Sequence, residues 1–159
     1  MNGILLVEDS DSDASLVQRA FRLAGIKREL QRICDGADAL DYLQRAETGS
    51  GNPAPIPSVL LLDLNLPRLG GIEILEWLRG RQAFDKMLRI VLSQIDDIQT
   101  IKNAYAAGAH SYLTKPLHQS EVNDLVASFP VYFSFFARTL PILPDCRKPS
   151  AGLSTDPPQ

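Results

Sequence analysis

The sequence predicts an α/β protein built on a five-stranded parallel sheet with helices on both faces. Short apolar runs alternate with segments of helical periodicity from residue 4 to about residue 128. Strands that alternate with helices form βαβ units, and their right-handed crossovers give parallel strands. The run VLLLDL, from Val59 to Leu64, is apolar at nearly every position, which is typical of a central strand buried on both faces.

The predicted elements follow one another in a regular order. Strands are expected at residues 4–7, 30–33, 59–62, 90–92 and 111–113. The helices between them have apolar faces, formed by Val17, Ala20, Phe21 and Ala24, by Ala37, Leu40 and Leu43, by Ile74, Leu75 and Leu78, and by Ile98, Ile101 and Tyr105. A fifth helix is expected from Gln119 onward.

Length and composition predict one globular domain. The chain has 159 residues, of which 45% are hydrophobic and 22% charged, and its formal net charge is −3. These values exclude a disordered chain and a disulfide scaffold, and they lack the basic character of a nucleic-acid-binding protein. The amino terminus has no basic leader, and no apolar run approaches the roughly 20 residues of a membrane span. We therefore expect a cytoplasmic protein that binds neither nucleic acid nor membrane.

Composition also divides the chain into segments. Residues 1–128 carry the alternating pattern, interrupted by a Gly- and Pro-rich loop at residues 47–57. Residues 129–140 form an aromatic extension, and residues 141–159 hold five of the eleven prolines. We expect this Pro-rich tail to be disordered.

Polar residues follow the predicted strands at the edge where such sheets bind ligands. Glu8 and Asp9 follow the first strand, Asp63 follows the third, Ser93 ends the fourth and Lys115 follows the fifth. Converging carboxylates repel one another unless a cation lies among them, and hard oxygen ligands suit Mg²⁺. A cation at this edge would also neutralise an incoming phosphoryl group, so the pattern indicates phosphoryl transfer to an aspartate.

With these motifs the chain resembles the response-regulator receiver domains of two-component signalling, over about residues 3 to 128. The motifs are the pair Glu8-Asp9, the D-x-N-x-P run Asp63–Pro67, Gly71, Ser93, Tyr112 and the dipeptide Lys115-Pro116. Ser93, Tyr112 and Lys115 lie 30, 49 and 52 residues after Asp63, in agreement with the family's pattern. The resemblance implies a flavodoxin-like sheet of order 2-1-3-4-5.

The resemblance also implies a metal-dependent phosphoacceptor. Asp63 would accept a phosphoryl group from a histidine kinase, and the protein would catalyse its own phosphorylation and dephosphorylation without being a conventional enzyme. Asp9 and Asp63 would bind Mg²⁺ directly, Glu8 through water, and Asn65 through its backbone carbonyl. Glu8 replaces the more usual aspartate in this pattern.

Further residues receive roles from the same resemblance. Lys115 would contact the phosphoryl oxygens, and a cis peptide bond before Pro116 would orient it. Ser93 and Tyr112 would form a switch that responds to phosphorylation. Gln94 stands where a small residue is typical, so we expect it to screen the phosphoryl site and to alter reaction rates.

The aromatic extension predicts a self-association surface. Apolar residues recur every three or four positions from Val122 to Leu140, so helix five is expected to continue past the sheet, unless Pro130 kinks it or starts a new helix. We expect a homodimer through helix five and five aromatic residues, which are Phe129, Tyr132, Phe133, Phe135 and Phe136. The alternative is that this extension folds back over its own domain.

A narrower resemblance concerns stand-alone regulators that serve phytochrome-type histidine kinases. It depends on the loop at residues 47–57, the LLLDLNLP run and the helical extension that ends at Thr139–Pro141. No segment is long enough to form an output domain, so the predicted role is a phosphorelay carrier or a protein-interaction switch.

Three competing interpretations remain open at this stage. A haloacid-dehalogenase-like phosphatase also uses an aspartate with Mg²⁺, but it needs a second acid where Asn65 stands. A flavodoxin-like FMN carrier needs a phosphate-binding first loop, which the carboxylates from Glu8 to Asp13 would repel. The third is an interaction module that no longer takes phosphate, against which the set of Asp63, Ser93 and Lys115 argues.

Overall fold

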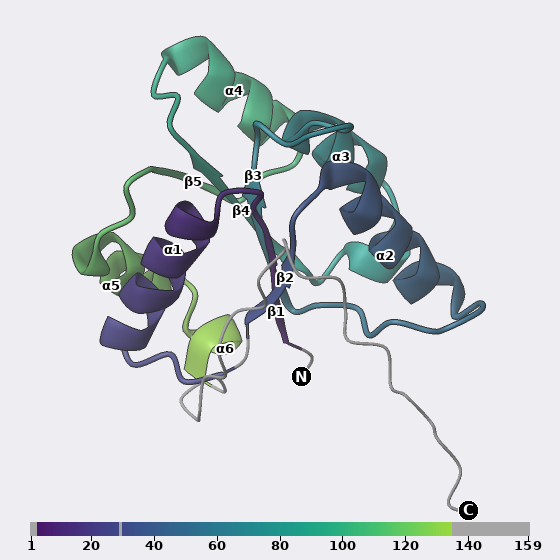
Figure 1. Cartoon of the computed structure of the whole chain (residues 1–159), viewed down its shortest axis with the longest axis horizontal. Coiled ribbons are helices and arrows are strands. Elements are labelled where there is room, and N and C mark those ends of the chain that lie inside the picture. The colour runs from purple at the N-terminus through teal and green to yellow at the C-terminus, as the bar shows by residue number, and fades with distance from the viewer. Residues whose placement is uncertain (1–2, 29, 135–159) are drawn as a thin grey trace, which may run out of the picture.

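The computed structural model describes residues 3–28 and 30–134, which form a parallel sheet between two layers of helices (Figure 1). The strand order is β2-β1-β3-β4-β5, so the predicted fold class and sheet order are confirmed. The strands are β1 (Ile4–Val7), β2 (Leu30–Ile33), β3 (Val59–Asp63), β4 (Leu88–Ser93) and β5 (Ser111–Thr114). Because all pairings are parallel, the carboxyl ends of the strands meet at one edge.

Helices α1 and α5 cover one face of the sheet, and α2, α3 and α4 cover the other (Figure 1). The helices are α1 (Asp11–Leu23), α2 (Gly36–Thr48), α3 (Gly71–Leu78), the 3-10 helix η1 (Gln82–Phe84), α4 (Ile98–Ala107), α5 (Gln119–Ser128) and α6 (Pro130–Phe133). Among the described residues, none of these helices has the length and apolar character needed to cross a membrane.

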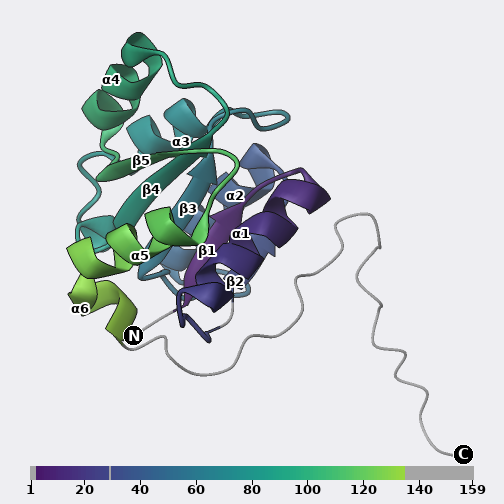
Figure 2. The same cartoon turned by 90° about the vertical axis from the view of Figure 1, so that its left-hand side faces the viewer.

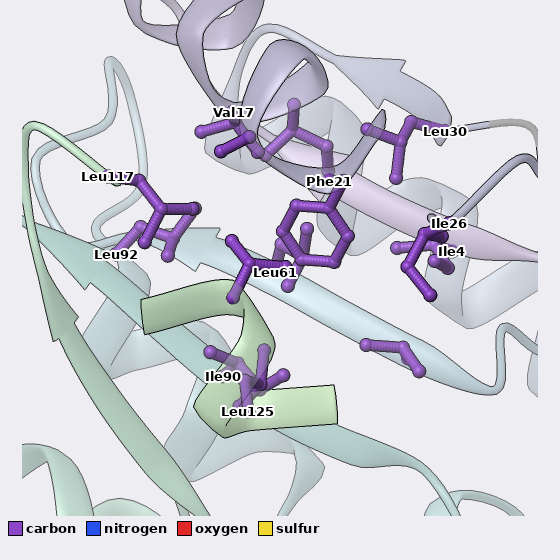
Figure 3. Close-up of a cluster of buried hydrophobic side chains, with 14 of the residues drawn as sticks. Ile4, Val17, Phe21, Ile26, Leu30, Leu61, Ile90, Leu92, Leu117 and Leu125 are labelled. Atoms are coloured by element: carbon purple, nitrogen blue, oxygen red, sulfur yellow. The ribbon is translucent and has the colours of Figure 1, made fainter. Parts of the chain in front are cut away.

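Two apolar cores, one on each face, hold the helices to the sheet. On one face Phe21 of α1 lies beside Leu61 of β3, and Leu125 of α5 lies near Ile90 of β4 (Figure 3). Strand β3 is buried at all five positions, because its residues alternate between the two cores. Burial of each large apolar side chain contributes on the order of 1.5–3 kcal/mol, so the centre of the sheet is a rigid support for the residues that follow it.

The apolar face predicted for the fourth helix is wrong at two of its three residues, and the third, Ile101, is half-buried. Ile98 and Tyr105 of α4 are 70% and 47% exposed, whereas Ala104 and Ala107 are buried against the sheet. The pattern misleads because the buried side of α4 is made of small residues, and the large apolar residues lie outside. The predicted loop at residues 47–57 also begins later, because Thr48 is the last residue of α2. Gly49 caps the helix in the left-handed conformation (φ 64°).

Helix five is interrupted at Phe129. Helix α5 ends at Ser128, and Pro130 is the first residue of α6, where its missing N–H leaves no bond unmade. Phe133 of α6 is buried against Phe21, with ring centroids 6.1 Å apart. The continuous, overhanging helix is therefore wrong as far as the described residues extend, and the alternative that Pro130 starts a new helix is confirmed.

The first part of the aromatic extension packs on its own domain. The Tyr132 hydroxyl donates a hydrogen bond to the Lys86 carbonyl (3.0 Å), and the Phe129 ring meets the Tyr132 ring edge-on. Phe133 is 1% exposed, so its place in a dimer interface was predicted wrongly: the side chain completes the core of its own domain. Phe135 and Phe136 lie outside the described residues, and the homodimer stays a prediction.

Candidate metal and phosphoryl-acceptor site

The strand ends bring the predicted site residues to one edge of the sheet. Asp63 is the last residue of β3, Glu8 and Asp9 follow β1, and Lys115 follows β5. Their backbones are fixed by pairing of parallel strands, in which Val7 lies opposite Leu62 and Asp63 lies opposite Leu92. Residues far apart in the chain thus meet in one place without any long loop.

Three carboxylates form a compact acidic cluster at this edge. One ligand oxygen each from Glu8, Asp9 and Asp63 lies within 4.8 Å of the others. Glu8 and Asp63 are buried, and Asp9 is exposed. A small set of hard oxygen ligands that is open to water on one side fits Mg²⁺, which keeps several of its waters when bound.

Lys115 lies among carboxylates. Its ammonium nitrogen donates to Glu8 Oε2 and lies 3.1 Å from Asp13 Oδ2 and 3.2 Å from Asp63 Oδ2. Burial of the ammonium opposes its charged form, but the hydrogen bond that it donates to Glu8 and the charge of Asp63 outweigh burial and raise the pKa of Lys115. Burial raises the pKa of Glu8, although the hydrogen bond from Lys115 acts in the opposite direction.

A cavity of about 320 Å³ opens over these groups. Its lining consists of Glu8, Asp9, Ser10, Ser12, Asp13, Asp63, Asn65, Gln94 and Lys115. The Asn65 N–H donates to Asp63 Oδ1 (3.1 Å), and the peptide bond between Lys115 and Pro116 is cis. Gln94 and Asp63 both line the cavity, so Gln94 borders the space next to the Asp63 carboxylate.

Gly71 lets helix α3 begin directly behind the acidic cluster. A Cβ at this position would meet the Asp63 carbonyl oxygen at 2.4 Å, far inside contact distance. The Gly71 N–H donates to the Leu64 carbonyl (3.0 Å) and closes the loop after β3. Only glycine permits this close approach, which accounts physically for the glycine eight residues after Asp63.

Ser93 and Tyr112 both bind the backbone of Ile95. Ser93 Oγ accepts a hydrogen bond from the Ile95 N–H (3.1 Å), and the Tyr112 hydroxyl donates to the Ile95 carbonyl (2.6 Å). Ser93 is fully buried at the end of β4, and Tyr112 is half-buried in β5. The two residues expected to form a switch thus hold opposite sides of the same segment between β4 and α4.

Two residues at the site escaped sequence reasoning. Asp13 was assigned no role at the site, but it lies in the first turn of α1, which Ser10 caps, and its carboxylate pairs with Lys115. Arg32 of β2 reaches the loop after β1 and was not expected there at all. The available signal for Arg32 was its position two residues after Leu30 in β2. Residues two apart in a strand point to the same face, so Arg32 lies on the buried face with Leu30.

A five-stranded parallel sheet with an acidic triad and a lysine at its carboxyl edge defines a class of signalling domain. The family model for the response regulator receiver domain matches residues 4–127, so the chain belongs to the response regulator receiver domain family. This assignment leaves the haloacid-dehalogenase-like and FMN-carrier interpretations without support.

Individual relatives are similar to this chain over most of their own length. The response regulator Rcp1 of Synechocystis sp. is 32% identical over 123 residues, covering 77% of this chain and 82% of Rcp1. "Probable methanogenesis regulatory protein FilR2" of Methanothrix harundinacea is 33% identical over 130 residues, covering 82% of each chain.

Solved structures agree with these sequence relationships. The Mn²⁺-bound crystal structure of Rcp1 matches with a TM-score of 0.66 and 31% identity, covering 91% of this chain and all of that chain. The phosphorylated cyanobacterial phytochrome response regulator RcpA matches with a TM-score of 0.65 and 27% identity, covering 84% of this chain and 94% of that chain. The resemblance to stand-alone, phytochrome-associated response regulators is confirmed.

Proposed function

We propose that Asp63 accepts a phosphoryl group from a histidine kinase in a Mg²⁺-dependent reaction. The protein then acts as a phosphorelay carrier or as a protein-interaction switch. The observation that carries this proposal is the position of Asp63: its carboxylate lies in a three-carboxylate cluster spanning 4.8 Å and 3.2 Å from the Lys115 ammonium. An acceptor carboxylate, a set of metal ligands and a cation for the phosphoryl oxygens therefore share one cavity.

Four residues of the cavity would hold the metal. Asp9 and Asp63 would bind Mg²⁺ directly, Glu8 through water, and Asn65 through its backbone carbonyl. The bound cation would neutralise negative charge on the transferring phosphoryl group. Glu8 has a second task in this chain, because it also accepts a hydrogen bond from Lys115.

The transfer itself uses the Asp63 carboxylate as the nucleophile. An Asp63 oxygen forms a bond to phosphorus while the bond from phosphorus to the donor nitrogen of a phosphohistidine breaks, and that nitrogen keeps the electron pair. Lys115 stabilises the negative charge on the phosphoryl oxygens. Attack of water on the phosphorus of the acyl phosphate returns Asp63 and inorganic phosphate.

Ser93 and Tyr112 would couple the phosphoryl group to the surface. Ser93 Oγ would exchange its bond from the Ile95 N–H for one to a phosphoryl oxygen, and this exchange would release one side of the segment that Tyr112 also holds. The relatives Rcp1 and RcpA support a phytochrome-type kinase as the partner in the cytoplasm. A homodimer remains part of the proposal, now without Phe133; light scattering at tens of micromolar tests it.

Incubation with Mg²⁺ and acetyl phosphate, followed by intact mass spectrometry, tests the proposal. We expect one phosphoryl adduct on the wild type, its loss on addition of EDTA before the donor, and its loss in Asp63→Asn. Asp41→Asn is the matched control, because Asp41 is an exposed acid on α2 that pairs with Arg45. An absent adduct on the wild type would favour the interaction module that takes no phosphate.

A further inference from the structure

Arg32 is a buried arginine whose guanidinium reaches the loop that carries two of the cluster's carboxylates. It is the third residue of edge strand β2, and its side chain is 2% exposed in its ion pair with Asp11. Its Nε donates to the Glu8 carbonyl (2.9 Å), and one terminal nitrogen donates to the Asp9 carbonyl (3.2 Å). The other terminal nitrogen lies 2.8 Å from Asp11 Oδ1.

These contacts fix the backbone at both carboxylate positions. The Glu8 N–H already donates to the Ile33 carbonyl (3.0 Å), so β2 holds Glu8 by its amide and, through Arg32, by its carbonyl. The peptide group after Asp9 is held by the same planar side chain. Because one rigid fork makes all these bonds, Glu8 and Asp9 cannot turn independently of β2.

Two effects of Arg32 on a bound cation act in opposite directions. Its positive charge repels a divalent cation, whereas its hydrogen bonds hold the ligands in place before the cation arrives. The Asp11 carboxylate at 2.8 Å compensates most of the charge, because the pair acts as a dipole at the distance of the cluster. Positioning is therefore the larger effect.

We propose that Arg32 is a positioning residue that presets Glu8 and Asp9 for a divalent cation and thereby sets the metal affinity of the site. This inference rests on the proposed function, since it assumes that the acidic cluster binds metal. It predicts that the shape of the side chain matters as well as its charge, because an ammonium cannot reproduce the fork.

Titration with Mn²⁺, followed by the electron paramagnetic resonance signal of the free ion, tests this inference. We expect Arg32→Lys, which keeps the charge, and Arg32→Met, which removes it, both to weaken Mn²⁺ binding by about tenfold or more. Arg89→Lys is the matched control: Arg89 is also a buried strand arginine that donates to a backbone carbonyl, that of Phe84, but it lies near the amino end of β4. We expect this control to keep wild-type affinity even where its melting temperature falls.

The outcomes separate the two effects. Wild-type affinity in Arg32→Lys, or tighter binding in Arg32→Met, would overturn the inference and assign the effect to charge. Equal weakening in Arg89→Lys would assign it to general loss of stability. If Arg32→Lys does not fold, Arg32→Met decides by the same criterion. Absence of Mn²⁺ binding in the wild type would instead overturn the proposed metal site, and the inference with it.

Discussion

Lys115 and Asp13 form an ion pair, with 3.1 Å between the ammonium nitrogen and Oδ2 of the carboxylate. Asp13 comes from the first turn of α1, so Lys115 joins that helix to the ends of β1 and β3. The cation that would meet a phosphoryl group is thus shared by three carboxylates. Asp13 adds negative charge to the lining of the cavity, and it would compete with that phosphoryl group for Lys115.

Removal of the Asp13 charge should accelerate phosphorylation. In Asp13→Asn, an incoming phosphodonor meets one negative charge fewer and a less occupied Lys115. A single charge at this range through water and protein corresponds to a change of about two- to fivefold in rate. The initial rate of adduct formation with acetyl phosphate, measured by intact mass, checks this expectation.

Asp11→Asn is the matched control for that experiment. Asp11 lies in the same turn of α1, but its carboxylate pairs with Arg32. An equal acceleration in both variants would show a general charge effect, and the specific role of the pair between Lys115 and Asp13 would be wrong.

Truncation of Gln94 should shorten the lifetime of the phosphorylated protein. Gln94 borders the cavity above Asp63, so Gln94→Ala opens a path for the attacking water. We expect the phosphorylated fraction, followed by intact mass after removal of the donor, to decay several times faster. Gln99→Ala is the control, because Gln99 lies exposed on α4 and binds Asn103. Identical decay in Gln94→Ala and the wild type would refute the expectation.

Ser93 and Tyr112 should be energetically coupled through Ile95. Removal of the bond from the Tyr112 hydroxyl in Tyr112→Phe should lower the free energy of unfolding by about 0.5–1.5 kcal/mol. Once Ser93→Ala has released the Ile95 N–H, the same change should cost less, because the segment is already loosened. Urea unfolding of the two single variants and the double variant measures this coupling. Simple additivity would mean that the two residues act independently.

His110 should make stability depend on pH below neutrality. Its Nδ1 accepts a hydrogen bond from the Arg89 N–H (2.9 Å), which only the neutral ring can do. Partial desolvation of the ring, and secondly the charge of Arg89, lower the pKa of His110 from 6.5. The unfolded chain therefore binds more protons than the folded one as pH falls through 6.5, so stability present above 6.5 is lost toward the folded-state pKa.

The comparison of wild type with His110→Asn isolates this effect, because asparagine offers an acceptor but does not titrate. We expect the urea midpoint of the wild type to fall more than that of the variant when the pH is lowered from about 7.5 to about 5.5. These two values lie about one unit on either side of the ordinary pKa of histidine. Parallel curves for the two proteins would contradict the expectation.

Phe133 should be as important for stability as a central core residue. Phe133→Ala removes a buried ring that packs on Phe21 and should lower the free energy of unfolding by about 3–5 kcal/mol. Val131→Ala on the same helix is the control, because Val131 is 67% exposed and should change stability by less than about 0.5 kcal/mol. A small effect of Phe133→Ala in chemical unfolding would restore this ring as a candidate for a partner surface.

The strands and the acidic cluster at their carboxyl ends could be predicted because their signals are local. Continuous apolar runs mark buried parallel strands, and the residue after each run must lie at the carboxyl edge. The position of Asp63, Glu8 and Lys115 follows from these two rules alone. The compact cluster in the structure has the geometry that they predict.

The missed features depend on tertiary contacts that no local pattern encodes. Arg32 and Asp13 acquire their roles from partners on other elements, and their own sequence neighbourhoods are those of a strand residue and a helix cap. The face of α4 was misassigned because a hydrophobic pattern gives large apolar side chains more weight than alanine. In the structure the small residues Ala104 and Ala107 are the ones that pack against the sheet. Val122, Val126 and Phe133 lie on helices, although on α5 and α6 rather than on one helix, and their periodicity does not tell which molecule covers them.

Helix α6 and the acidic cluster lie at opposite ends of the domain. Helix α6 lies at the amino ends of the strands (Figure 2), where Tyr132 binds the Lys86 carbonyl just before β4, whereas Asp63 is the last residue of β3. Helix α5, with ten residues and a length of about 15 Å, connects these two ends. A displacement of α5 at the end near Lys115 would therefore also move α6. The Phe133 ring of α6 packs on Phe21, so this displacement would change the packing between α6 and α1.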